Sequence, residues 1–333
     1  MTAERSASDT TGPVLVTGAG GFIGGHLVAS LSAAGHRVRA IDIKPFDQWC
    51  QLHIEADNRI ADLRLRDDAF AAVRGVRSVF NLASDMGGMG FIEANKAACM
   101  LNVLIDTHLI DAARHEDLEA YFYASTACVY PSYRQDDPAV TALSEADTYP
   151  ADPEDGYGWQ KLFGERLCGN YLEDYGVPVR VGRYHNVYGP LGTWAGGREK
   201  APAAICRKVA EAVLSGRHEI EIWGDGEQTR SFTFVDDGVE GTRRLAESDV
   251  TMPLNIGSSE LVSINQLVDI VSSIAGVDLE RHHDLTAPQG VRGRNSDNTE
   301  IRNRLGWEPS IDLRSGLERT YEWVAEQVWR AAH

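Results

Sequence analysis

The sequence lacks the features that mark several common classes of protein. It contains no run of about 18 consecutive apolar residues, so it offers no candidate membrane span and predicts a soluble globular protein. Its 5 cysteines are odd in number, widely spaced and never arranged as Cys-x-x-Cys, which indicates neither a disulfide framework nor a zinc or other metal site. A reducing compartment, the cytoplasm, suits this cysteine content.

The sequence contains fewer basic than acidic residues. Lysine and arginine number 32 against 49 aspartates and glutamates, a formal net charge of −17. This balance argues against nucleic acid as a partner, and any anionic ligand must be bound by local basic residues. Residues 1–12 are small and polar without the apolar centre of a signal peptide, so we expect a flexible tail there.

What is present is the pattern of an α/β protein. The chain has 333 residues, of which 43% are hydrophobic, enough to bury a large core. Short apolar runs at 14–17, 38–43, 76–83, 120–124 and 176–188 are separated by segments with helical periodicity. Strands that alternate with helices predict a doubly wound parallel sheet of the Rossmann type. The pattern becomes less regular after residue 188, and we expect a second, smaller α/β lobe interleaved with the first.

A glycine-rich turn follows the first apolar run. Gly18, Gly21 and Gly24 form a Gly-x-x-Gly-x-x-Gly motif between a predicted strand and a predicted helix that opens at Phe22 and Ile23. Such a turn lets backbone approach a pyrophosphate and points free amides of the helix N-terminus at it. We therefore expect a dinucleotide to bind here.

Asp42 ends the second predicted strand, about 20 residues further on, where a carboxylate accepts hydrogen bonds from a ribose 2′-hydroxyl and repels a 2′-phosphate. This favours NAD over NADP as the cofactor, although Lys44 weakens the inference. Asp62 falls where an adenine contact is expected, and an exposed acidic turn explains it almost equally well.

Tyr157 and Lys161 stand four residues apart, on one face of a helix if the segment is helical. The lysine would lower the pKa of the phenol so that tyrosinate takes a proton from a substrate hydroxyl as hydride leaves the carbon. Thr126, after Ser125 at the end of a predicted strand, supplies a hydroxyl at the carboxyl edge of the sheet. Together these residues indicate the Ser/Thr-Tyr-Lys set of short-chain dehydrogenases/reductases.

Longer strings carry a closer resemblance. The chain resembles the extended short-chain dehydrogenases that act on nucleotide sugars and, among them, the GDP-mannose 3,5-epimerases. The resemblance covers about residues 13–325, and the strings that carry it lie at 85–92, 125–130, 182–190, 192–204, 223–226, 230–237 and 290–298.

The resemblance implies an isomerase that inverts C3 and/or C5 of a GDP-hexose, giving GDP-L-galactose and/or GDP-L-gulose from GDP-mannose. Carbon-bound protons of a sugar are scarcely acidic, so oxidation at C4 must come first, and two acid/base groups then exchange protons at C3 and C5. By family likeness these groups are Cys128 and Lys200. From its position in the sequence alone, Cys128 is also consistent with a small core residue, and Lys200 with a surface lysine.

Cys128 lies two residues after Thr126, and we expect the segment between them to be extended, with both side chains on one side. Arg230, Arg292 and Arg294 offer planar forks for a diphosphate, although each could equally be a surface ion-pair arginine. The predicted contacts with the nucleotide sugar are Gly87, Gly88, Asn186, Lys200, Lys208, Gln228, Arg230 and Arg292.

The predicted division is residues 13–184 plus about 231–258 for NAD and about 185–230 plus 259–333 for the GDP-sugar. A homodimer is expected by resemblance only. Two alternatives remain: an epimerase that inverts one position of another GDP-sugar, and a non-catalytic NAD-binding regulator. The regulator would have no need of Tyr157, Lys161 or Cys128, all of which are present.

Overall fold

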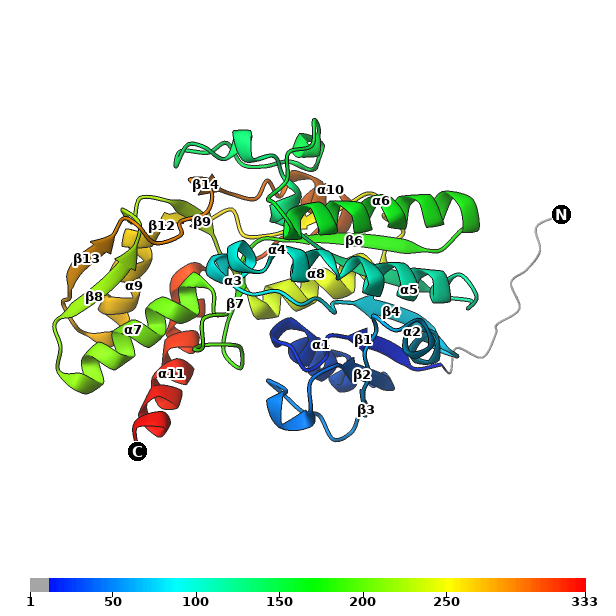
Figure 1. Cartoon of the computed structure of the whole chain (residues 1–333), viewed down its shortest axis with the longest axis horizontal. Coiled ribbons are helices and arrows are strands. Elements are labelled where there is room, and N and C mark those ends of the chain that lie inside the picture. The colour runs from blue at the N-terminus through cyan, green and yellow to red at the C-terminus, as the bar shows by residue number, and fades with distance from the viewer. Residues whose placement is uncertain (1–11) are drawn as a thin grey trace.

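The computed structural model describes residues 12–333, so the predicted tail lies outside the described residues except for Gly12. A layered body with a long sheet occupies one side of the molecule, and a smaller group of helices and short strands occupies the other (Figure 1). The predicted α/β architecture is confirmed, since one seven-stranded sheet has the order β11-β6-β5-β4-β1-β2-β3 and every pair in it is parallel.

Apart from the polar, exposed edge strand β3, the main sheet is built from short, mostly apolar runs. Residues of β1 point alternately to its two faces, Val14 and Val16 into one core cluster and Leu15 into the other. A strand that is buried on both faces needs apolar residues at every position, which is why these runs do not alternate with polar residues. The strands are β1 (Val14–Thr17), β2 (Val38–Asp42), β3 (Asp57–Ile60), β4 (Ser78–Asn81), β5 (Ala120–Thr126), β6 (Val179–Tyr184) and β11 (Leu254–Ile256).

Helices cover both faces of this sheet. On one face α2 (Arg66–Val73), α5 (Val103–Ala113) and α6 (Tyr157–Tyr175) pack side by side, and on the other α1 (Phe22–Ala33) packs against α8 (Val235–Glu247). The short helices α3 (Met89–Ala94) and α4 (Lys96–Met100) lead into α5. Because the strands are parallel, the carboxyl ends of β1, β4 and β5 lie at one edge of the sheet. Open α/β sheets bind their ligands at this edge.

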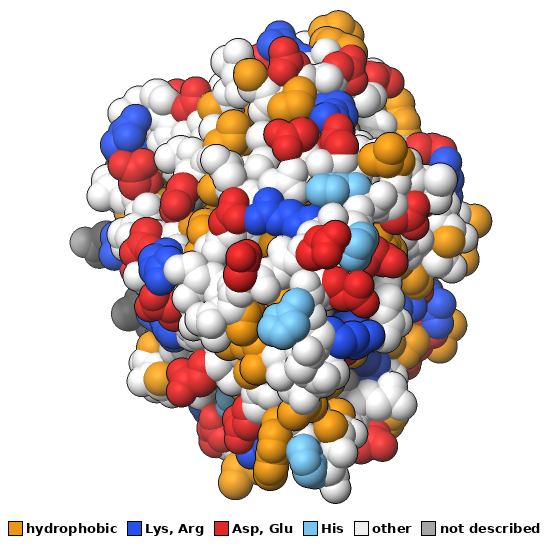
Figure 2. Space-filling model, turned by 90° about the vertical axis from the view of Figure 1, so that its left-hand side faces the viewer, with side chains coloured by type: hydrophobic (Ala, Val, Ile, Leu, Met, Phe, Trp, Pro, Cys, Tyr) orange, Lys and Arg blue, Asp and Glu red, His pale blue; other side chains and the backbone are white. Residues whose placement is uncertain are grey.

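The smaller part of the molecule packs α7 (Ala201–Ser215), α9 (Ile264–Ala275) and α11 (Leu313–Ala332) against one another. Figure 2 shows the end formed by this part, where basic and acidic side chains are intermixed. Its remaining elements are β7 (Val187–Tyr188) with β10 (Thr233–Phe234), β8 (Glu219–Trp223) with β13 (Glu280–Asp284), and β9 (Thr229–Ser231) with β12 (Leu261–Ser263) and β14 (Gly293–Arg294). The short helix α10 (Thr299–Leu305) packs against β11 of the main sheet.

One strand prediction was wrong. The run at 176–188 is two strands, β6 and β7, because the chain turns at Asn186, which has a φ of 40°. The turn carries β7 away from the main sheet to pair with β10. Over residues 12–333, no helix has the length and apolar composition needed to cross a membrane.

Candidate active site

The turn between β1 and α1 forms a cradle that only glycine can line. Gly18 has a φ of 68°, a conformation that L side chains rarely adopt, and a Cβ on Gly24 would overlap the Gly18 carbonyl oxygen. Gly21 caps α1 without any side-chain hydrogen bond, and the first turn carries no acidic residue. Within the described residues 12–333, the first helical amides, of Phe22, Ile23 and Gly24, are therefore free for an anion. This arrangement fits the pyrophosphate of NAD.

Asp42 stands at the end of β2 beside this cradle, 8% exposed. Its Oδ2 accepts a hydrogen bond from the Gly20 amide at 3.1 Å, and the Lys44 ammonium donates to the Gly20 carbonyl at 2.6 Å. Lys44 is thus committed to the backbone, and a carboxylate faces the position expected of the ribose. Asp62 forms a two-point ion pair with Arg64, which lowers the pKa of Asp62. Its predicted contact with adenine stays a prediction.

Thr126, Tyr157 and Lys161 converge at the carboxyl edge of the sheet. Thr126 is the last residue of β5 and Tyr157 the first of α6, where Gly156 turns the chain with a φ of 73°. Lys161 follows one helical turn later, with its Nζ 5.9 Å from the centre of the Tyr157 ring and 4.9 Å from that of Tyr123. The predicted helix and the shared face are both present.

Burial of both side chains acts against the expected effect of Lys161 on the pKa of Tyr157, and that effect stays a prediction. Burial raises the pKa of Tyr157 far above its usual value, and a hydrogen bond to Thr126 opposes the rise. Burial also lowers the pKa of Lys161, against the attraction of the Asp106 carboxylate. Removing both groups from water disfavours their charged forms, and this outweighs the influence of one on the other.

Cys128 lies directly behind Thr126. The expectation of an extended segment was wrong, because Ala127–Val129 is a single 3₁₀ turn capped by Thr126, whose Oγ1 accepts the Cys128 amide at 3.2 Å. The thiol is 7% exposed, and Arg294 Nη1 donates to its Sγ at 3.3 Å. Burial, with the charge of Glu154, raises the pKa of Cys128 to about 11, while Arg294 opposes this.

Lys200 reaches the same cluster from the start of α7. It is partly buried, and this burial lowers the pKa of its ammonium, which Cys128 and Glu154 attract and Arg294 repels. The Gly88 amide donates to the Arg198 carbonyl at 3.0 Å, two residues before Lys200. The segment after β4 is therefore joined to the segment that carries Lys200.

Three residues predicted to contact the sugar, Gly87, Gly88 and Asn186, are held by close contacts within the chain. A Cβ on Gly87 would meet the Phe91 Cβ at 2.8 Å, and one on Gly88 would meet the Glu199 carbonyl oxygen at 2.5 Å. The Asn186 amide donates to the Ser231 carbonyl at 3.0 Å. Gly88 and Asn186 join segments distant in sequence, whereas Gly87 packs within its own segment, and contact of the three residues with a sugar stays a prediction.

The predicted phosphate contacts already have partners. Arg292 makes a two-point ion pair with Asp225, at 3.0 and 2.9 Å. Lys208 donates to the Glu221 carbonyl at 2.8 Å, and Gln228 to the Trp223 carbonyl at 2.9 Å. A phosphate would have to exchange places with these groups.

Arg230 is different, because its partners are neutral. It donates to the carbonyls of Thr229 at 2.7 Å and Val291 at 2.5 Å, and burial with the repulsion of Arg294 lowers the pKa of Arg230 to about 9. Within residues 12–333 this partly buried guanidinium forms no ion pair with a carboxylate, and it therefore favours the approach of an anion.

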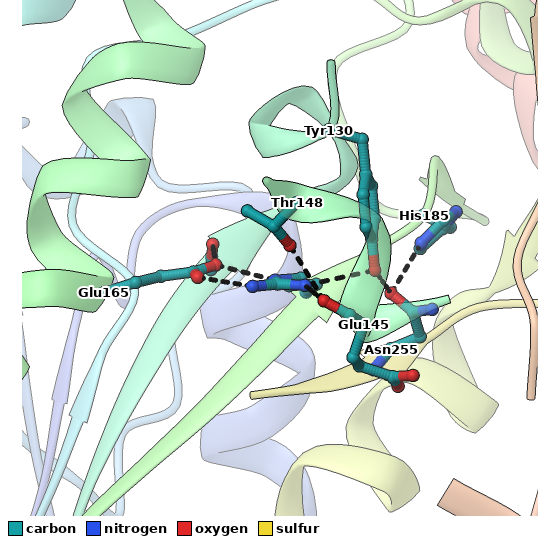
Figure 3. Close-up of polar contacts among 8 residues, drawn as sticks. Tyr130, Glu145, Thr148, Glu165, His185 and Asn255 are labelled. Atoms are coloured by element: carbon teal, nitrogen blue, oxygen red, sulfur yellow. Dashed lines mark hydrogen bonds and ion pairs between the residues drawn. The ribbon is translucent and has the colours of Figure 1, made fainter. Parts of the chain in front are cut away.

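Sequence reasoning missed several polar residues around the site. Arg183 makes a two-point ion pair with Glu165, at 2.9 and 2.7 Å, and also donates to the Tyr130 hydroxyl at 3.2 Å (Figure 3). Ser125 donates to Glu165 as well, so the network fixes the end of β5 next to Thr126. Its further members are Glu145, Thr148, His185 and Asn255.

Glu154 was also missed. It lies three residues before Tyr157 in an acidic loop, and that position next to the predicted phenol was the signal available. Its Oε2 is 3.7 Å from Arg294 Nη2. Among the residues that the structure describes, no group of three or more His, Cys, Asp or Glu is placed to hold a metal ion.

A glycine turn, Asp42 at the end of β2 and a Thr-Tyr-Lys set at the carboxyl edge of one parallel sheet are typical of nucleotide-binding enzymes with a Rossmann-type fold. Residues 14–257 match the NAD dependent epimerase/dehydratase family, and the chain belongs to that family. The predictions of a Rossmann-type fold and of NAD as the cofactor are confirmed.

Comparison with individual proteins indicates which members of this family the chain resembles. The chain is 48% identical to GDP-mannose 3,5-epimerase 1 of Oryza sativa subsp. japonica and 46% identical to GDP-mannose 3,5-epimerase of Arabidopsis thaliana, in each case over 95% of this chain and 82% of the relative. Among solved structures it is similar to UDP-glucose 4-epimerase of Thermotoga maritima, with a TM-score of 0.85, 25% identity and coverage of 95% of this chain and 99% of the other. These findings bear out the predicted resemblance and the predicted epimerase class.

Proposed function

We propose that the chain epimerises a GDP-hexose, most specifically GDP-mannose at C3 and/or C5, with NAD as a cofactor that ends each cycle unchanged. The observation that carries the proposal is the placement of Cys128 and Lys200 beside the Thr126, Tyr157 and Lys161 set. A reaction that only oxidised and reduced C4 would need no second pair of proton-exchanging groups.

Tyr157 and Thr126 act on the C4 hydroxyl. Thr126 Oγ1 lies next to the phenol and hydrogen-bonds the C4 oxygen, and Tyr157, as the tyrosinate, takes the C4 hydroxyl proton and becomes a phenol. NAD, held at the Gly18, Gly21 and Gly24 turn, would supply the hydride acceptor for C4 when bound. Lys161, buried one turn along α6, supplies positive charge behind Tyr157, and Asp106 holds that charge in place.

Cys128 and Lys200 exchange the protons of the neighbouring carbons. Once C4 is a ketone, the electron pair of an adjoining C–H bond passes into the carbonyl, so removal of that proton becomes feasible. The two groups come from different elements, one after β5 and one at the start of α7, and thereby offer a donor and an acceptor on separate sides of a ring.

We propose that the nucleotide and diphosphate lie along β9 and β14. Arg230 is partly buried there and, among the described residues 12–333, forms no ion pair with a carboxylate. Arg292, Gln228 and Lys208 lie on adjoining segments. In this assignment Arg292 leaves Asp225 when a phosphate binds, while Gly87, Gly88 and Asn186 shape the hexose pocket. Because Arg–phosphate pairs are strong and directional, they justify breaking an exposed ion pair.

The proposed division of the chain assigns residues 13–184 plus about 231–258 to NAD and about 185–230 plus 259–333 to the GDP-sugar. The inclusion of β11 in the main sheet and the packing of α8 on it support this division.

We propose a homodimer that works in the cytoplasm. Apolar side chains on the outer surfaces of α4, α5 and α6 support an interface there, because they form an exposed set along neighbouring helices. These side chains are Met100, Leu101, Leu104, Trp159 and Phe163.

The test is incubation of the purified protein with GDP-mannose in D₂O, followed by proton NMR and mass analysis of the recovered nucleotide sugar. We expect deuterium at C3 and C5, or at the single carbon that is inverted. Cys128→Ala should abolish inversion while bound NAD is retained. Absence of deuterium at both carbons in folded, NAD-loaded protein would rule out GDP-mannose as the substrate, and full activity of Cys128→Ala would remove this residue from the reaction.

A further inference from the structure

Glu154 is a carboxylate in contact with the thiol that the proposed function uses. Its amide donates to the Cys128 carbonyl at 3.0 Å, which holds the two residues together through the backbone. The Glu154 side chain is only 15% exposed. Within residues 12–333, its Oε2 is buried without a hydrogen-bond partner, an arrangement that is costly unless a proton or a donor reaches this atom.

One guanidinium joins the carboxylate to the thiol. Arg294 Nη1 donates to Cys128 Sγ at 3.3 Å, and Arg294 Nη2 lies 3.7 Å from Glu154 Oε2. Arg294 Nε is occupied by Gln135 at 2.6 Å, so the guanidinium is fixed. The Arg294 guanidinium stabilises a negative charge on either the Cys128 sulfur or the Glu154 carboxylate. It therefore does not strongly favour one of these two groups over the other as the site of a proton that they share.

Glu154 also faces solvent. An open hollow of about 400 Å³ is lined by Glu154 and by Ile92, Glu93, Lys96 and Asp155. Cys128 itself is 7% exposed. The carboxylate consequently lies between a buried thiol and water.

The thiol needs such a partner if it is to act as a base. Burial and the negative charge of Glu154 raise the pKa of Cys128 to about 11, so at neutral pH the residue is a thiol. The other charged or titratable groups that face the pair are Lys200 from α7, Arg230 from β9, Arg294 from β14 and Tyr157 from α6.

We propose that Glu154 is the proton partner of Cys128 and carries protons between the sulfur and the solvent-filled hollow. In the basic step the S–H bond breaks, an O–H bond forms on Glu154, and the negative charge moves from oxygen to sulfur beside Arg294. The thiolate then takes a proton from the sugar carbon, and the C–H electron pair passes into the adjoining C4 carbonyl. Glu154 acts through Cys128 and is a positioning residue for its proton. This inference rests on the proposed function.

The first test compares Glu154→Gln with Asp155→Asn. Both variants replace a carboxylate by an amide in the same loop, but Asp155 is exposed and paired with Lys96. At pH 7 in D₂O, Glu154→Gln should lose deuterium exchange by roughly 10²-fold at the one carbon that Cys128 serves, and exchange at the other carbon should persist. Raising the pH should restore the lost exchange by about tenfold per unit, because hydroxide then replaces the missing acceptor.

A substrate-free measurement separates this inference from the proposed function. The rate of Cys128 alkylation by iodoacetamide is followed against pH in the full chain by peptide mass spectrometry. In Glu154→Gln the midpoint should move to lower pH, because a negative charge beside the thiol has been removed, and in Asp155→Asn it should stay at the wild-type value.

Three results would overturn the inference: an unchanged alkylation midpoint in Glu154→Gln, a wild-type rate and pH profile of exchange in that variant, or equal loss at both carbons without recovery at high pH. The last would make the carboxylate a purely structural partner of Arg294. If wild-type protein exchanges no deuterium with GDP-mannose, the proposed function fails, and the alkylation midpoint still decides whether Glu154 governs the proton of Cys128.

Discussion

The contact of Gly88 with the segment before Lys200 makes a prediction of definite size. A Cβ on Gly88 would lie 2.5 Å from the Glu199 carbonyl oxygen, whereas ordinary contact begins at 3.4 Å. The Gly88→Ala substitution must therefore move the two backbones apart by the difference, about 0.9 Å. The Gly88 φ of −67° suits alanine, so the effect is a displacement and not a strained dihedral angle.

The displacement should fall on Lys200, the residue after Glu199. Misplacement of a reacting group by about 1 Å costs on the order of 10²-fold in rate. We expect Gly88→Ala to lose about 100-fold in the initial rate of deuterium exchange with GDP-mannose at the carbon served by Lys200, while bound NAD is retained. The rate is measured by proton NMR in D₂O, and thermal unfolding is recorded in parallel.

Gly90→Ala is the matched control, because its Cβ would lie 3.6 Å from the Trp223 ring, an ordinary contact. It stands on the same segment and adds the same methyl group. Rates for the two alanine variants within a few-fold of each other would refute the reasoning, because Lys200 would then tolerate the movement of its loop. So would loss of NAD in Gly88→Ala, which would place the damage elsewhere.

Three further predictions concern the cofactor and stability. Gly24→Ala places a Cβ onto the Gly18 carbonyl and should abolish copurification of NAD, so intact NAD content in the isolated variant would contradict the cradle. Arg183→Met leaves Glu165 as an uncompensated buried charge and should lower the free energy of unfolding in urea by about 3–5 kcal/mol, with recovery when Glu165→Leu is added; a loss below about 1 kcal/mol would show that water reaches the carboxylate. Burial lowers the pKa of His185 from an ordinary 6.5 to about 3, so the unfolded chain takes up a proton that the folded chain does not, and stability contributed above pH 6.5 is lost as the pH falls toward 3. His185→Gln should remove about 1.4 kcal/mol per pH unit of this dependence in urea titrations, and an unchanged dependence would count against a neutral buried imidazole.

The parts of the site that could be predicted are those that depend on neighbours in sequence. The Gly18, Gly21 and Gly24 turn, Asp42 at the end of its strand, and Tyr157 with Lys161 on one helix face all follow from local geometry. The parallel sheet follows for the same reason, because strands that alternate with helices leave few other arrangements.

The rest depends on which distant residue meets which. Arg292 and Arg294 are two residues apart and equally suited to a phosphate, yet one pairs with exposed Asp225 and the other is buried against Cys128. No local pattern distinguishes them, because the difference arises from how β14 joins β9. Glu154 was not predicted for a similar reason. The role of its buried oxygen depends on the Arg294 guanidinium, which lies far from it in the sequence.

The pairing of Cys128 with Arg294 has a consequence for the order in which the protein is made. The two residues are separated by 166 positions, so a chain emerging from the ribosome presents the glycine turn, the phenol and the thiol long before the guanidinium that completes the thiol's surroundings. Contacts of such long span form late, because the intervening loop must first be closed. In a partially synthesised chain, the Cys128 thiol would therefore lack its contact with Arg294. In the proposed reaction, proton exchange on carbon would therefore become available only after Arg294 has been synthesised and has packed against Cys128.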